Sequence, residues 1–218
     1  MIRGAIFDMD GTLLDSMPFW ENAGEIYLAS IGVAAKPGLS KVLYPLTVPE
    51  AAAYVKKAYG LSQTQSGIEA GINRTVESFY FDKAPAKNGV AEFLEGLRGY
   101  GIKKAVATVT GRECAGAALT RLGLMPLFER IVTSDEVSTG KDQPDIYLRA
   151  AQVLGTSVKQ TLVFEDAVYA ARTSARAGFV TVGVYDGSCT VQEELRSVCR
   201  YYISGFEDFH AFAAEALL

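Results

Sequence analysis

The sequence lacks the features that would place this protein in a membrane or on a nucleic acid. No apolar run approaches the roughly 20 residues that a helix needs to cross a bilayer. The first acidic residue, Asp8, comes too early for the apolar region of a signal peptide. The 21 basic residues form no block and are outnumbered by 25 acidic ones. The sequence therefore gives no sign of the clustered positive charge that proteins use to bind nucleic acids. We therefore expect a cytoplasmic protein that binds neither membranes nor nucleic acids.

Cysteine and histidine are also scarce. The three cysteines, Cys114, Cys189 and Cys199, are scattered and odd in number. They match neither a disulfide framework nor the ligand spacing of a zinc site, which fits a reducing compartment. The single histidine, His210, falls in the C-terminal helix and is assigned no role.

The bulk composition is that of an ordinary globular protein. Of 218 residues, 49% are hydrophobic and 21% are charged, which is close to the average for soluble domains. A chain of this length can bury a sizeable core. The length therefore allows one large domain, or one domain with a smaller insert.

The hydrophobic pattern divides the chain into two kinds of segment, one all helical and one of alternating strands and helices. Residues 17–82 show only helical periodicity, which predicts three or four helices, three of them at about 19–31, 48–58 and 66–80. Elsewhere short apolar strands alternate with helices, which indicates a parallel sheet covered on both faces. The strands are expected at 5–7, 105–108, 131–133, 162–164, 180–184 and 201–203, and the main helices at 90–100, 112–122, 145–154 and 168–177. We therefore predict an α/β core of residues 1–15 and 85–218, a doubly wound parallel sheet, with an all-helical domain inserted at 16–84.

Two carboxylates, Asp8 and Asp10, end the first strand and are followed at once by Gly11 and Thr12. In an extended segment, residues i and i+2 lie on the same side, so both carboxylates can face one point. At that separation they repel each other unless a proton or a cation lies between them. By itself this motif fits an acidic turn as well as it fits a functional site.

Three further polar features fall at or just beyond strand ends: Thr108, Lys141 and the pair Glu165-Asp166. Each alone has an ordinary explanation, as a helix cap, a solvated loop lysine, or a partner of a helix dipole. All of them, however, fall where a doubly wound sheet binds its ligands, outside the carboxyl ends of the strands. Their combination with the acidic pair predicts an active site.

This set of side chains suits phosphoryl transfer. The oxygens of Asp8, Asp10 and Asp166 are the hard ligands that Mg²⁺ prefers. One carboxylate of the first pair could attack phosphorus, and the other could protonate the leaving oxygen and then activate water. Lys141 and Thr108 would compensate charge on the phosphoryl oxygens, on which this chemistry mainly depends.

The features follow the order and spacing of the four motifs of the haloacid dehalogenase superfamily. They read Asp8-Met9-Asp10-Gly11-Thr12, then Thr108, then Gly140-Lys141 before Pro144-Asp145, then Phe164-Glu165-Asp166. A helical insert after the first motif resembles the cap domain of its β-phosphoglucomutase-like phosphatase branch. The resemblance implies a Mg²⁺-dependent phosphatase that acts on a small phosphorylated metabolite. We expect a monomer or a weak homodimer.

The resemblance also implies a role for each residue. Asp8 matches the nucleophile, and Asp10 matches the general acid/base whose backbone carbonyl also ligates the metal. Asp8 and Asp166 match the carboxylate ligands, with Glu165 as a further candidate ligand. The phosphate-positioning pair is Thr108 and Lys141.

Some positions depart from the family pattern. Trp20 stands where β-phosphoglucomutases carry a histidine, and the insert lacks the Thr-Gly-x-Ser-Arg-type stretch that binds their second phosphate. Both absences favour a phosphatase over a phosphosugar mutase. The mutase, and a non-catalytic sensor on the same scaffold, are the alternative hypotheses. An acid at Asp10 argues against a metal-free dehalogenase. Asp142, Ala167 and Ala170 replace commoner Pro, Ser and Gly close to the metal site.

Overall fold

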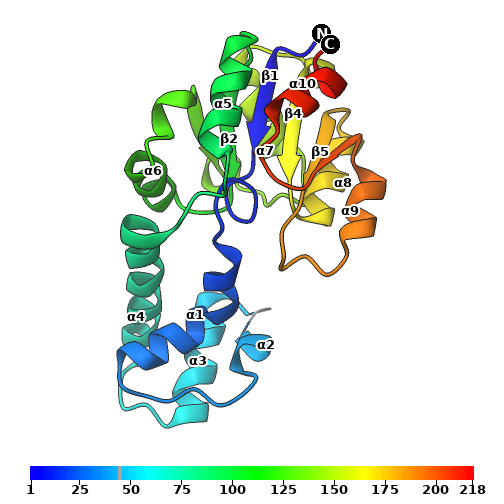
Figure 1. Cartoon of the computed structure of the whole chain (residues 1–218). Helices are drawn as coiled ribbons and strands as arrows, with labels where there is room; N and C mark the ends of the chain where they lie inside the picture. The colour runs from blue at the N-terminus through cyan, green and yellow to red at the C-terminus, as the bar shows by residue number, and fades with distance from the viewer. Residues whose placement is uncertain (44–45) are drawn as a thin grey trace. The chain divides into compact units, whose positions relative to one another are not determined.

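The structure is a computed structural model that describes residues 1–43 and 46–218, shown in Figure 1. The chain divides into two compact units. Met1–Asp15 together with Pro85–Leu218 form one unit, which we call the core. Ser16–Ala84 form the other unit, which we call the insert.

The core is built on a six-stranded parallel sheet in the order β3-β2-β1-β4-β5-β6. This confirms the predicted doubly wound fold. Successive strands run outward from β1 in one direction and from β4 in the other, so the strand order reverses between β1 and β4, where such sheets bind their ligands. The strands are β1 (Gly4–Phe7), β2 (Lys103–Thr108), β3 (Arg130–Thr133), β4 (Thr161–Glu165), β5 (Val180–Val184) and β6 (Tyr201–Ile203).

Helices cover both faces of this sheet because both faces of its strands are apolar. On one face, the stacked rings of Phe7 and Phe164 lie beside Phe93 of α5. On the other face, Ile6 and Val163 pack in one cluster with residues of α7. The core helices are α5 (Val90–Gly99), α6 (Arg112–Arg121), α7 (Asp145–Leu154), α8 (Val168–Arg176), α9 (Gln192–Val198) and α10 (Phe209–Ala216), with short 3₁₀ turns at Met125–Leu127, Ser134–Glu136 and Val158–Gln160.

The insert is all helical, as the sequence predicted. It has a hydrophobic cluster of its own, which includes Leu28, Val55 and Ile68. The helix that begins at Val48 has a capping box, in which Glu50 accepts a hydrogen bond from the backbone N–H of Thr47 at 2.8 Å. The helices are α1 (Met17–Ser30), α2 (Leu39–Leu43), α3 (Val48–Tyr59) and α4 (Gln65–Ser78), which runs into a π-helical turn at Phe79–Lys83.

Two short helices were not located from the sequence. Helix α2 has five residues and buries one of them, Leu39. Helix α9 has seven and buries one, Leu195. A helix that buries a single side chain shows no apolar stripe, so periodicity cannot reveal it.

No helix in the described part of the chain is both long enough and apolar enough to span a membrane.

A nearly buried ion pair joins the segment before α5 to the loop after β5. Lys87 Nζ lies 2.8 Å from Asp186 Oδ2, with 14% and 4% of the two side chains exposed. Asp186 Oδ1 also accepts hydrogen bonds from the backbone N–H and the hydroxyl of Ser188, at 2.9 and 2.5 Å. Burial alone would raise the pKa of the Asp186 carboxyl, but the Lys87 and Ser188 contacts outweigh burial and hold it below its usual value.

Asp186→Asn should therefore lower the free energy of unfolding by about 1–3 kcal/mol at neutral pH. A carboxyl whose pKa is lower in the folded chain adds stability above its unfolded pKa of about 4, and that stability is lost as the pH falls through the folded value. The difference between wild type and variant should thus shrink below about pH 4. Urea unfolding at a series of pH values measures it. A difference that stays constant down to pH 2.5, or equals that of the exposed Asp135→Asn, would contradict this account.

Candidate active site

Three buried carboxylates meet at the carboxyl ends of β1 and β4. Asp8, Glu165 and Asp166 each offer an oxygen within 4.8 Å of the others. The register of the sheet explains this, because Phe7 pairs with Phe164 and the next residues of the two strands are therefore neighbours. The sequence predicted that the strand ends before Glu165. In the structure, Glu165 is instead the last residue of β4. The structure thus brings together Asp8, Asp166 and the candidate ligand Glu165.

Lys141 is the counter-ion of this cluster. Its side chain is 3% exposed, its ammonium contacts Asp8 Oδ1, and it lies 2.7 Å from Glu165 Oε1. Burial alone would lower the pKa of this ammonium, but the two carboxylates outweigh burial and raise it. Lys141 is therefore charged at any physiological pH, and it is not the solvated loop lysine that its position alone would suggest.

Gly11 and Thr12 form the turn that holds Asp166. The Thr12 hydroxyl donates to Asp166 Oδ1 at 2.8 Å. Gly11 has a φ of +80°, and a Cβ there would lie 2.4 Å from Asp166 Oδ2. Only glycine fits this backbone beside the carboxylate. Burial, followed by the charges of Asp8 and Glu165, raises the pKa of the Asp166 carboxyl well above its usual value, so both desolvation and the neighbouring carboxylates disfavour its charged form.

Asp10 and Thr108 are linked through a residue that the sequence analysis missed. The Thr110 hydroxyl donates to Asp10 Oδ2 at 2.7 Å, and the Thr110 backbone N–H donates to Thr108 Oγ1 at 3.0 Å. Thr108 ends β2 and is fully buried. The Asp10 carboxylate thus contacts the loop after β2, whereas the Asp8 carboxylate contacts Lys141. The signal for Thr110 was its spacing of two from Thr108, which parallels that of Asp8 and Asp10.

The two oxygens of Glu165 have different surroundings. Oε1 accepts hydrogen bonds from Lys141 Nζ and from the Tyr147 hydroxyl, both at 2.7 Å. Oε2 is buried and has no hydrogen-bond partner among the residues that the structure describes. A buried carboxylate oxygen without a partner is costly. Three carboxylates with one ammonium and one unpaired oxygen fit a hard divalent cation.

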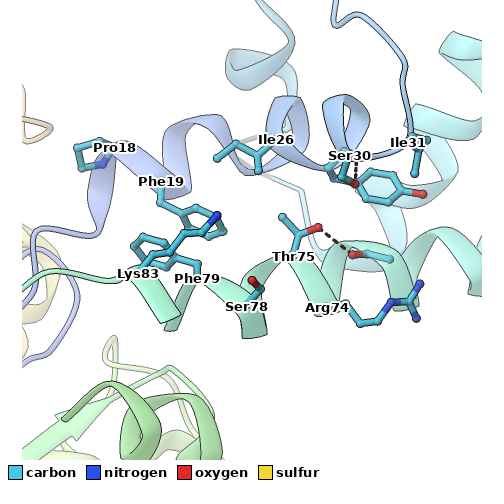
Figure 2. Close-up of a pocket in the computed structure, with 12 residues that line it drawn as sticks. Pro18, Phe19, Ile26, Ser30, Ile31, Arg74, Thr75, Ser78, Phe79 and Lys83 are labelled. Carbon is cyan, nitrogen blue, oxygen red and sulfur yellow. Dashed lines mark hydrogen bonds between the residues drawn. The ribbon is translucent and has the colours of Figure 1, made fainter. Parts of the chain in front are cut away.

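A pocket of about 600 Å³ lies within the insert, between α1 and α4 (Figure 2). One end is walled by the stacked rings of Phe19 and Phe79, whose centroids are 3.9 Å apart. The exposed Arg74 and Lys83 also line it, and none of the predicted catalytic residues do. Trp20 is absent from the lining, and its indole N–H donates to the Tyr80 hydroxyl at 2.9 Å. Trp20 is therefore held by a contact within the insert.

Comparison with known proteins agrees with this geometry. The family of haloacid dehalogenase-like hydrolases matches residues 5–184. The phosphorylated carbohydrates phosphatase of Thermotoga maritima is 27% identical, over 81% of this chain and 82% of the relative. The validoxylamine A 7'-phosphate phosphatase of Streptomyces hygroscopicus subsp. limoneus is 30% identical, over 84% and 86%. A crystal structure from Thermotoga maritima, provisionally assigned as a β-phosphoglucomutase, superposes with a TM-score of 0.87 at 25% identity and covers 99% of this chain and 100% of that one.

The match to the family spans most of the chain and includes the acidic motif of β1, the buried lysine and the acidic pair of β4. Sequence, fold and site therefore lead to one assignment. The chain belongs to the haloacid dehalogenase-like hydrolases and is a phosphatase of that family, a phosphoric monoester hydrolase.

Proposed function

We propose that this protein is a Mg²⁺-dependent phosphatase that hydrolyses a small phosphorylated metabolite, with sugar and polyol phosphates as the leading substrate class. The observation that carries the mechanism is the buried cluster of Asp8, Glu165 and Asp166 around Lys141. The substrate class rests on relatives whose names specify phosphorylated carbohydrates and hexitols.

In the proposed reaction, Asp8 is the nucleophile. Its carboxylate attacks phosphorus, the bond to the ester oxygen breaks, and an aspartyl-phosphate forms. Asp10 gives a proton to the leaving oxygen and later takes one from the water that hydrolyses the intermediate. The hydrogen bond from Thr110 would hold the Asp10 carboxylate in place between the two steps.

Lys141 and Thr108 would hold the phosphoryl group. The ammonium of Lys141 already contacts Asp8 and would compensate charge on both nucleophile and phosphoryl oxygens. Thr108 Oγ1 accepts a hydrogen bond from the Thr110 backbone, so its own hydrogen can be donated to a phosphoryl oxygen.

The carboxylates of Asp8, Asp166 and Glu165 and the backbone carbonyl of Asp10 would hold the Mg²⁺ ion. The unpaired Glu165 Oε2 is the observation that supports an additional ligand from this residue. When bound, Mg²⁺ would polarise the phosphoryl oxygens and offset their charge. We further propose that the insert acts as the cap that determines substrate specificity.

Removal of divalent metal should abolish phosphate release. With 5 mM Mg²⁺ we expect turnover of sugar phosphates in a panel that also contains nucleotides, phosphoglycolate and phosphoserine. EDTA should reduce the rate by at least about 100-fold, because loss of several kcal/mol of charge stabilisation has an effect of this size. Excess Mg²⁺ should restore the rate, as measured by release of inorganic phosphate. Undiminished turnover in exhaustively chelated protein would contradict the proposal.

A phosphosugar mutase is the second candidate, because a solved structure with the same fold is provisionally assigned to that activity. Product analysis with a hexose 1-phosphate separates the two reactions. A mutase returns the isomeric hexose phosphate with little free phosphate, whereas a phosphatase releases phosphate and hexose in equal amounts. We expect the second result, since Trp20 occupies the position at which mutases carry a histidine.

A further inference from the structure

We propose that Tyr147 is a positioning residue for the metal site, which leaves one oxygen of Glu165 available for the ion by occupying the other. This inference rests on the proposed Mg²⁺ site. Tyr147 is not part of the acidic motifs, and its phenol group has no role in the reaction proposed above.

The position of Tyr147 is well defined. It is the third residue of α7 and is fully buried. Its hydroxyl donates to Glu165 Oε1 at 2.7 Å. The ammonium of Lys141 donates to the same oxygen at 2.7 Å and lies 5.9 Å from the centre of the Tyr147 ring. Helix α7 thus places a neutral donor on Glu165 beside the charged donor that precedes the helix.

Two donors on one carboxylate oxygen make the group asymmetric. A carboxylate oxygen has two lone-pair sites, so Oε1 is saturated by Lys141 and Tyr147. Oε2 is buried without a hydrogen-bond partner in the described part of the chain. With Oε1 fixed at two points the carboxylate cannot exchange its oxygens, and Oε2 is the atom left for a cation. Hydrogen bonds of this kind orient metal ligands and raise the affinity of the site.

The rest of the Tyr147 side chain has a different function. Its ring belongs to the hydrophobic cluster that includes Ile6 and Val163, and its centre lies 6.2 Å from that of Phe179. A phenylalanine would keep this packing and remove only the hydroxyl. Tyr147→Phe therefore separates the hydrogen bond from the contribution of the ring to the core.

We expect Tyr147→Phe to weaken Mg²⁺ binding by about 10- to 100-fold, the range for loss of a group that orients a metal ligand. Calorimetric titration of the purified protein with Mg²⁺ measures the affinity without substrate. The electron paramagnetic resonance of added Mn²⁺ gives a second value. Turnover at saturating Mg²⁺ should stay within about threefold of wild type, because the hydroxyl does not touch the reacting atoms. The matched control is Tyr100→Phe, which removes a hydroxyl from a tyrosine that is 49% exposed.

The outcomes separate this inference from the proposed function. Wild-type metal affinity in Tyr147→Phe would overturn the positioning role and leave the phosphatase mechanism intact. Lower thermal stability with unchanged metal affinity would also overturn it, since the hydroxyl would then be only structural. If wild-type protein bound neither Mg²⁺ nor Mn²⁺, the proposed metal site would fail, and the inference with it.

Discussion

Asp8→Asn should abolish phosphatase turnover, by on the order of 10⁴-fold or more, as expected when a nucleophile is removed. An amide oxygen cannot replace the carboxylate as a nucleophile, yet asparagine has nearly the same shape. The fold should therefore persist. The variant also removes one of three negative charges that lie within 4.8 Å of one another, so metal-free protein should be at least as stable as wild type.

Phosphate release under saturating Mg²⁺ tests the first part of this prediction, and the thermal midpoint in EDTA tests the second. Asp135→Asn is the matched control, because it makes the same chemical change at an exposed position of the core and should leave both quantities unchanged. Full turnover by Asp8→Asn would exclude Asp8 as the nucleophile. Loss of activity together with unfolding would show that its main contribution is structural.

Lys141→Met should have the second large effect, on stability and on activity together. Methionine fills a similar volume, but Asp8 and Glu165 would lose the ammonium that both contact. Breaking a buried ion pair by removing one partner lowers the free energy of unfolding by about 3–5 kcal/mol. Turnover should fall by about 10³-fold, because the cation also compensates charge on the transferred group.

Lys104→Met is the matched control for this prediction. Taken as whole residues, Lys104 in β2 and Lys141 are 3% and 4% exposed, so they are equally buried. Among the residues that the structure describes, the ammonium of Lys104 has one hydrogen-bond partner, the Ile102 carbonyl, at a long 3.4 Å. Burial lowers the pKa of this ammonium, and the attraction of Glu95 does not outweigh it. The same substitution should therefore leave stability unchanged or raise it, by up to about 1 kcal/mol.

Urea unfolding of both lysine variants, with and without Mg²⁺, makes the comparison. In Lys141→Met, Mg²⁺ should recover part of the lost stability, because a divalent cation can neutralise the same carboxylates. Equal destabilisation by the two substitutions would show that buried methylene packing, and not the charge of Lys141, accounts for the effect.

Much of the architecture could be predicted because it depends on local patterns. The apolar runs of the strands and the periodicity of helices such as α7 are visible within a few residues. Asp8 and Asp166 could be predicted as neighbours because the carboxyl ends of parallel strands lie along one edge of the sheet. Helices α2 and α9 could not be located from the sequence because each buries one side chain and so leaves no pattern.

The sequence by itself determined the fold class and the acidic motif that begins at Asp8, because both depend on the spacing of residues that are close together in the chain. Only the tertiary structure decided which groups contact which. The contact of Lys141 with Glu165 joins residues 24 apart, and that of Thr110 with Asp10 joins residues 100 apart. Such contacts depend on strand register and on where a helix begins, and no local pattern encodes the hydrogen bond of Tyr147 to Glu165. The structure therefore added the partners that orient the predicted carboxylates.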